Sequence, residues 1–203
     1  MSQEPTVFLV DDDATVRDAL GLFLEASDLV VRAYASAQEF LRHYQPDWPG
    51  CMVLDIRMPG MTGLELQKVL KRRRIEIPII FLTGHGDIPM SVKALKAGAV
   101  DFIEKPFKDA VLLDRIREAI AIDVHRRRIA AQKMQITHRL AQLTCREKQV
   151  LVYVISGLSN KEIAKKLHVS HRTIDVHRAR IMTKMEASSL PELINLTTMC
   201  DIR

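Results

Sequence analysis

Residues 7–13 read VFLVDDD, in which four apolar residues run directly into three aspartates. A short apolar run without polar alternation is typical of a strand that is covered on both faces of a parallel sheet. Adjacent carboxylates repel one another, so three of them at the end of such a strand require a positive partner. The stretch therefore predicts a buried strand that ends at an acidic site.

Similar apolar runs recur through the first half of the chain, at residues 29–34, 51–55, 77–83 and 100–104. The segments between them show helical spacing of apolar residues, as at Val16, Leu20 and Phe23. Strands that alternate with helices predict an α/β fold. We expect a five-stranded parallel flavodoxin-like (βα)5 domain over residues 1–122, with strand order 2-1-3-4-5.

The second half lacks this alternation. No Gly or Pro occurs between Phe107 and Leu143, which predicts one long helix that begins near Asp109 and continues as a helical linker over residues 123–142. Beyond it, three segments match the capping box that starts a helix, namely Thr144-x-x-Glu147, Ser159-x-x-Glu162 and Ser189-x-x-Glu192. With Ser170 as a further cap, the predicted helices span residues 145–156, 160–167, 171–185 and 190–199. A small all-α domain over 143–203 follows.

Charge divides the chain in the same way. Residues 1–122 carry 15 lysines and arginines against 18 acidic residues, whereas residues 123–203 carry 15 against 7. A basic half is compatible with nucleic acid, although a basic region is more often an ordinary solvated surface. The charge split therefore suggests two halves with different partners.

The cysteines and the apolar segments indicate where the protein works. Cys51, Cys145 and Cys200 are odd in number and far apart, which favours a reducing compartment over a disulfide framework. The N-terminus lacks the basic and apolar regions of a secretory signal, and no apolar run is long enough to cross a bilayer. We expect a cytoplasmic protein with no membrane partner.

The acidic site should lie where parallel strands end. Ligands of an open α/β sheet bind beyond the carboxyl ends of the strands, at the point where the strand order reverses. Asp11 and Asp12 end the first strand and Asp55 ends the third, so these carboxylates should converge. A hard divalent cation with oxygen ligands would relieve their repulsion, and Mg²⁺ is the expected ion, with Mn²⁺ as an alternative. Asp13 is expected to cap the following helix.

Two further side chains are expected at the same edge of the sheet. Thr83 ends the fourth strand and Lys105 ends the fifth. A hydroxyl, an ammonium group and a metal around one carboxylate suit an aspartyl phosphate, whose formation depends on positioning and charge neutralisation.

Several motifs in this order resemble the NarL/FixJ family of bacterial response regulators. They are VDDD, LDIRMPGMTGLEL, FLTGHGDIPMSVKALKAGAVDFIEKPF, LTCREKQVL and GLSNKEIAKKLHVSHRTIDVHRARIMTKM, over about residues 5–200. The resemblance implies that a sensor histidine kinase phosphorylates Asp55 and that Asp11, Asp12, Asp55 and the Arg57 backbone carbonyl bind the metal. It also implies that Thr83 and Phe102 form a switch pair, and that Lys105, before a cis peptide bond to Pro106, contacts the phosphoryl group. Beyond self-catalysed phosphoryl acceptance and autodephosphorylation, no enzyme activity is expected.

The basic end contains a helix-turn-helix pattern. Its second helix, at 171–185, is expected to enter the major groove of double-stranded promoter DNA. The basic residues are expected to contact DNA phosphates. The resemblance implies that Asp175, Val176 and Ala179 face the bases. The expected DNA contacts are Lys161, Lys165, Arg172, Thr173, Asp175, Val176, Ala179 and Arg180. Zinc at His168, His171 and His177 is disfavoured, because no Cys pair or fourth ligand accompanies them, and we expect groove-side or surface histidines instead.

The resemblance also implies a homodimer upon phosphorylation. The expected receiver contacts are Val92, Lys96 and Asp101, and the DNA-binding domains should pair through Leu193, Ile194 and Thr197. RNA polymerase is the expected further partner, because activation is the more common outcome in the family.

Two other functions compete with this one. A phosphatase or kinase that acts on outside substrates could use the same acidic site, but the chain has no GxxxxGK[ST] loop and no lid insertion. A constitutive DNA-binding protein could retain the first domain as a relic, but the complete set of acidic-site residues argues against that.

Overall fold

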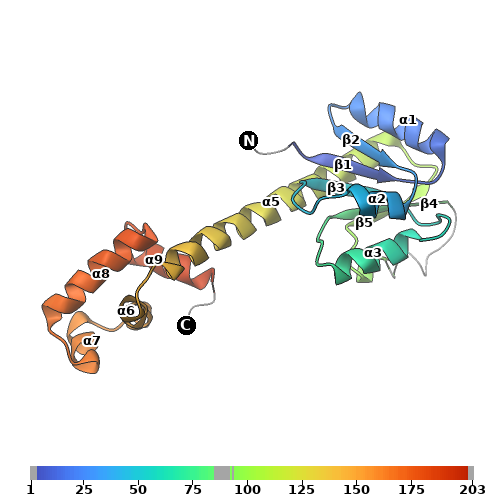
Figure 1. Ribbon diagram of the computed structural model, residues 1–203. Coiled ribbons are helices and arrows are strands. Elements are labelled where there is room, and N and C mark those ends of the chain that lie inside the picture. The colour runs from blue at the N-terminus through green and yellow to red at the C-terminus, as the bar shows by residue number, and fades with distance from the viewer. Residues whose placement is uncertain (1–3, 85–91, 93, 201–203) are drawn as a thin grey trace. The chain divides into compact units, whose positions relative to one another are not determined.

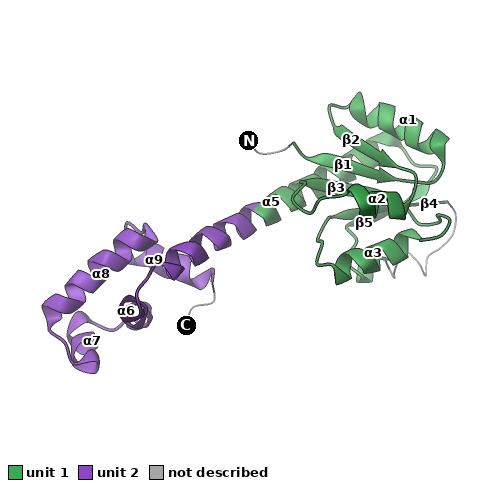
Figure 2. Ribbon diagram, in the orientation of Figure 1, with its two compact units in different colours: residues 1–127 green, residues 128–203 purple. Residues whose placement is uncertain are grey.

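The computed structural model describes residues 4–84, 92 and 94–200 and forms two compact units, residues 1–127 and 128–203 (Figure 2). Unit 1 contains one parallel sheet in the order β2-β1-β3-β4-β5, which confirms the predicted fold class and strand order (Figure 1). Its strands are β1 (Thr6–Val10), β2 (Val30–Tyr34), β3 (Gly50–Asp55), β4 (Ile79–Gly84) and β5 (Asp101–Lys105).

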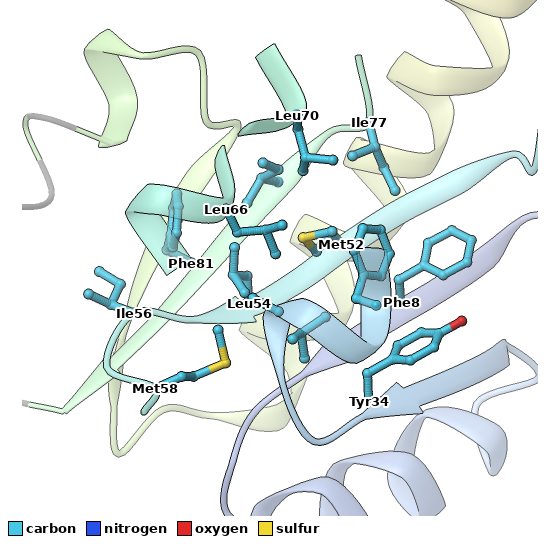
Figure 3. Packing of buried hydrophobic residues seen from close by; sticks show 14 of the residues in the cluster. Phe8, Tyr34, Met52, Leu54, Ile56, Met58, Leu66, Leu70, Ile77 and Phe81 are labelled. Carbon is cyan, nitrogen blue, oxygen red and sulfur yellow. The ribbon is translucent and has the colours of Figure 1, made fainter. Parts of the chain in front are cut away.

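Helices cover both faces of this sheet, because successive side chains of a strand point to opposite faces. On one face, Phe8 and Leu54 pack with Leu66 and Leu70 of α3 (Gly63–Arg72), and α2 (Ala37–His43) contributes Phe40 (Figure 3). On the other face, Val7 and Leu9 pack with α1 (Ala14–Glu25) and with the first turns of α5 (Asp109–Ala141). The VFLV run is therefore buried on both sides, as its sequence predicted.

Unit 2 consists of the second half of α5 and four short helices. These are α6 (Cys145–Ile155), α7 (Asn160–Leu167), α8 (His171–Met185) and α9 (Leu190–Thr198). Both α7 and α8 have the predicted bounds, and α6 and α9 end one residue early. The local capping signals therefore predicted these helices well.

Two of the three predicted capping boxes form as expected, at Thr144 and at Ser159. At the third, Ser189 caps α9, but the Glu192 carboxylate accepts from the backbone nitrogen and hydroxyl of Ser188, at 2.8 and 2.5 Å. The helix start is confirmed, and its hydrogen-bond partner is corrected.

The long helix predicted from Asp109 onward is present, and the predicted linker at 123–142 extends into both units. α5 is continuous, and its residues from 128 onward belong to unit 2. Ile136 is 3% exposed and lies with Leu140 in the core of unit 2, while Arg139 donates to the Met185 carbonyl at 3.3 Å. These contacts tie the part of α5 beyond residue 127 to unit 2. None of the helices described is long and apolar enough to span a membrane.

Candidate functional site

The acidic site forms where β1 and β3 end side by side. Asp11 follows β1, Asp55 is the last residue of β3, and the two strands pair up to Val10 and Leu54. The Lys105 ammonium bridges the two carboxylates, with its Nζ 2.8 Å from Asp11 Oδ2 and 3.0 Å from Asp55 Oδ1. Both aspartates are buried. The structure thus brings together three of the predicted site residues, from three different strand ends.

Local contacts hold the Asp55 carboxylate and the Asp11 backbone in place. The Arg57 amide donates to Asp55 Oδ2 at 2.6 Å, and the Arg17 guanidinium donates to the Asp11 carbonyl at 2.8 Å. Gly63 begins α3 directly against the end of β3, where an added Cβ would lie 2.3 Å from the Asp55 carbonyl oxygen. Only glycine permits this approach, so Gly63 sets the path of the loop that follows Asp55.

Burial and neighbouring charges act in opposite directions at this site. Burial raises the pKa of Asp55, and the Asp11 charge adds to this rise, while Lys105 and the Arg57 amide oppose it. Burial lowers the pKa of Lys105, but its hydrogen bonds to Asp11 and Asp55 outweigh that effect and raise it overall. Lys105 therefore remains an ammonium ion that partly neutralises the acidic site.

The structure leaves Asp12 outside this cluster. Its side chain is exposed, and nowhere in the described chain do three or more His, Cys, Asp or Glu side chains lie close enough to hold a metal ion. Lys105 supplies the positive charge in this conformation. The donors are nevertheless hard carboxylate oxygens, which is the ligand type that Mg²⁺ prefers. The residues fit a magnesium site if the Asp12 side chain turns inward and Lys105 gives up one of its two hydrogen bonds to Asp11 and Asp55.

The remaining predicted residues of unit 1 lie near the same edge. Thr83 is 1% exposed, and its hydroxyl lies 3.5 Å from the Gly84 carbonyl rather than on Asp55. Phe102 is half-buried and packs against the core that contains Phe81. The Lys105–Pro106 peptide bond is cis, as the resemblance implied.

Of the three residues predicted to pair two receiver domains, two are exposed and one already has a partner in its own chain. Val92 is 45% exposed and Lys96 is also exposed. Asp101, however, is paired with Arg115 of its own chain, with 2.8 Å between Arg115 Nε and Asp101 Oδ2. Any pairing of Asp101 with a second chain must compete with Arg115.

In unit 2, α7 and α8 form the predicted helix-turn-helix. His168 closes α7 in a left-handed conformation, with φ 52°, and Ser170 caps α8. Most of the predicted DNA contacts are exposed, namely Lys161, Lys165, Arg172, Asp175, Val176, Ala179 and Arg180. Thr173 is half-buried, and its hydroxyl lies 2.8 Å from that of Ser170. On α8 the exposed positions recur at helical spacing and form one accessible face.

The two hydrogen-bond partners of Asp175 on this face were not predicted from the sequence. Asn160 and His171 both contact Asp175, at 2.6 and 3.1 Å. The spacing of His171 and Asp175 on one helix, four residues apart, could have indicated the second contact. No local pattern connects Asn160 with Asp175, which lie on different helices.

The predicted pairing surface of α9 is corrected. Leu193 and Thr197 are each 1% exposed, and the Thr197 hydroxyl donates to the Ile194 carbonyl at 2.8 Å. Both side chains are needed inside unit 2, so they are not available to a second chain. Ile194, at 36% exposed, is the member of the predicted set that remains accessible.

Two family models match the chain, one over each unit. Residues 7–117 match the response regulator receiver domain, and residues 141–197 match the bacterial regulatory proteins of the luxR family. The first match covers most of unit 1 and the second lies within unit 2.

Curated proteins match over almost the whole chain. The transcriptional regulatory protein FixJ of Azorhizobium caulinodans is 43% identical over 100% of this chain and 96% of its own length. FixJ of Rhizobium meliloti is 46% identical over 94% of each chain. The response regulator protein TodT of Pseudomonas putida is 43% identical over 94% of this chain and 84% of its own.

Solved structures show the same similarity. The response regulator StyR is 44% identical, with a TM-score of 0.89 over 97% of this chain and 99% of that chain. Full-length FixJ from B. japonicum is 42% identical, with a TM-score of 0.60 over 99% of both chains.

Proposed function

The chain belongs to the NarL/FixJ family of response regulators, and on that premise we propose that Asp55 is its phosphoacceptor and that phosphorylation controls promoter binding by α8. A response regulator of this family couples a receiver domain to a LuxR-type DNA-binding domain and regulates transcription. The observation that carries the assignment of Asp55 is its position, at the end of a buried strand and within reach of both Asp11 and Lys105.

The chemistry at Asp55 is nucleophilic substitution at phosphorus. A carboxylate oxygen of Asp55 attacks the phosphoryl group of a phosphohistidine on the sensor kinase, the P–N bond breaks, and the imidazole leaves with the electron pair. The Lys105 ammonium lies where it can neutralise the incoming phosphoryl oxygens. We expect the Thr83 hydroxyl, which lies at the end of the neighbouring strand, to turn toward the phosphoryl group, with Phe102 moving in response. The family is not one of classical enzymes, and we assign no outside substrate.

The acidic site would hold Mg²⁺ through Asp11, Asp12, Asp55 and the Arg57 backbone carbonyl. When bound, the ion neutralises the charge that develops on the transferred phosphoryl group. The chain's own part is to keep Asp11 and Asp55 buried, with Arg17 on the Asp11 backbone carbonyl and the Arg57 amide on the Asp55 carboxylate. Mn²⁺ has similar ligand preferences and is a second candidate.

The output is specific binding to promoter DNA in the cytoplasm, as a phosphorylated homodimer that recruits RNA polymerase. The exposed cations of α7 and α8 would contact phosphates, which positions the protein but carries no sequence information. Val176 is 44% exposed on α8 and suits a thymine methyl group. The apolar Val92 and the accessible Ile194 would contribute to pairing of the two chains.

A small phosphodonor with Mg²⁺ tests the assignment. Intact mass should show one added phosphoryl group on the unmodified protein and on Asp13→Asn, which removes the same charge from the α1 cap. Asp55→Asn should gain none, and its DNA binding should not respond to the phosphodonor. A phosphorylated Asp55→Asn protein would show that the phosphoacceptor is another residue.

The DNA-binding half can be tested separately. Residues 128–203 form a compact unit whose core includes Ile136. This segment should bind DNA without phosphorylation, with an affinity that falls as salt rises, because phosphate contacts release counterions. An affinity that does not change with salt would exclude a phosphate interface.

A further inference from the structure

A polar network joins the start of the second helix of the helix-turn-helix to α7. His171 is the first residue of α8, and Asn160 is the first residue of α7. Asn160 Nδ2 donates to Asp175 Oδ1 at 2.6 Å, and Asp175 Oδ2 lies 3.1 Å from His171 Nδ1. Arg178 donates to Asn160 Oδ1 at 2.8 Å. These four side chains form one continuous series of hydrogen bonds across two helices.

The groups at the two ends determine the direction of every bond. A guanidinium only donates, so Asn160 must turn its oxygen to Arg178 and its nitrogen to Asp175. An ionised carboxylate only accepts, so His171 Nδ1 must carry a proton. In the neutral imidazole ring, His171 Nε2 is then an acceptor. The network thus selects one tautomer of His171.

The free edge of His171 is accessible. The side chain of His171 is 60% exposed and that of Asp175 is 51% exposed. Both carboxylate oxygens of Asp175 already have a partner, whereas His171 Nε2 has no hydrogen-bond partner among the described residues. In helix-turn-helix proteins, the residues at the N-terminus of the second helix contact base edges. His171 stands at that position.

We propose that His171 reads a base edge through Nε2 and that Asp175 is a positioning residue that fixes its ring and tautomer. An acceptor at Nε2 suits the exocyclic amino group of cytosine or adenine in the major groove. The inference rests on the proposed role of α8 as the DNA-contacting helix. It replaces the direct base contact that the sequence predicted for Asp175.

Exchanging the side chains of Asn160 and Asp175 distinguishes a positioning role of Asp175 from a direct contact between Asp175 and a base. In Asp175→Asn alone, Arg178 still makes Asn160 a donor toward position 175. The new amide must then offer its oxygen to Asn160 and its nitrogen to His171, which moves the imidazole proton to Nε2. Asn160→Asp alone places two carboxylates against each other. The double variant Asn160→Asp/Asp175→Asn restores every donor and acceptor and leaves no carboxylate at position 175.

Two measurements on the full-length, phosphorylated protein test this. Duplexes selected from a random-sequence pool by the unmodified protein serve as the probe, and fluorescence anisotropy at one salt concentration gives the affinity. Each single variant should bind about tenfold more weakly, and the double variant should recover to within about threefold. Nitrogen NMR at about pH 8, where histidine is neutral, should place the proton on Nδ1 in the unmodified and double variants and on Nε2 in Asp175→Asn.

His171→Phe should also lose about tenfold in affinity, while His138→Phe, at an exposed position on α5, should lose nothing. A double variant as weak as Asp175→Asn would show that Asp175 itself contacts the base, and it would overturn the inference. Full affinity in His171→Phe would overturn it as well. An unmodified protein that selects no duplex would refute the proposed function, and with it any base contact by His171.

Discussion

Lys105 holds Asp11 from a position 94 residues later in the sequence, with its ammonium 2.8 Å from the Asp11 carboxylate. The same ammonium lies 3.0 Å from the Asp55 carboxylate, so one cation forms ion pairs with both aspartates. A cation that binds these acids must share them with Lys105. The strength of metal binding and the reactivity of Asp55 are therefore both linked to this side chain.

Lys105→Met should tighten Mg²⁺ binding and slow phosphorylation. The substitution removes a positive charge next to the metal ligands, which should raise the affinity for Mg²⁺ by about threefold to tenfold. It also removes a cation from the incoming phosphoryl group, so that phosphorylation should slow by about tenfold or more. Fluorescence titration and intact mass measure the two effects. Lys108→Met, at an exposed lysine nearby, should change neither, and weaker Mg²⁺ binding in Lys105→Met would contradict the competition.

Asp55→Asn should make unit 1 more stable at neutral pH. Because the pKa of Asp55 is raised in the folded protein, its contribution to stability is complete below the unfolded pKa and is lost as the pH rises through the folded value. The ionised carboxylate therefore costs stability at about pH 7, and an amide avoids that cost. Urea unfolding followed by the single tryptophan, Trp48, measures the difference.

The gain from Asp55→Asn should shrink as the pH falls through the folded pKa of Asp55 and should be lost below about pH 4, where the carboxyl group becomes protonated in the unfolded state as well. Asp114→Asn, at an exposed position on α5, should show no such pattern. If Asp55→Asn were less stable than the unmodified protein at neutral pH, the carboxylate would be stabilised by Lys105 more than it is penalised by burial.

Val92→Asp should keep phosphorylation but weaken the dimer of the phosphorylated protein by about tenfold or more. Val92 is an exposed apolar side chain, and a carboxylate there would lose its apolar contact across the interface. An ion pair between Lys96 of one chain and Asp101 of the other would be exposed and would have to compete with Arg115, so the apolar contact should matter more.

Sedimentation velocity measures this dimer. Leu22→Asp is the matched control, because Leu22 is 70% exposed on α1 and lies outside the proposed interface. Equal dimerisation of Val92→Asp and Leu22→Asp would place the interface on another face.

Asp123→Asn should destabilise unit 1 by about 2–3 kcal/mol. Asp123 is fully buried on α5, accepts from the Gly50 amide at 2.9 Å, and pairs with Arg126 and Arg127. Arg127 in turn donates to the Trp48 carbonyl at 2.7 Å. Urea unfolding followed by Trp48 fluorescence measures the loss, and Asp114→Asn is the control. A loss below about 0.5 kcal/mol would show that this ionic cluster does not stabilise unit 1.

The sequence alone determined the elements of this protein and the kind of chemistry at its strand ends. The strands were predictable because apolar runs such as VFLV suit a sheet buried on both faces. The helix starts were predictable because a cap such as Thr144 with Glu147 acts within four residues. The acidic cluster followed from the rule that parallel strands end at one edge.

Only the tertiary structure decided which partner each polar group takes. Asp101 pairs with Arg115, Asp123 with the Gly50 amide, and Asp175 with Asn160, and in each case the partners come from different elements. The burial of Leu193 likewise depends on helices that precede it in the chain. Spacing along the sequence carries information about neighbours within a few residues. Contacts between elements depend on how the side chains of those elements pack together. A charged or polar side chain at such a contact pairs with whichever group the packing places within hydrogen-bond distance.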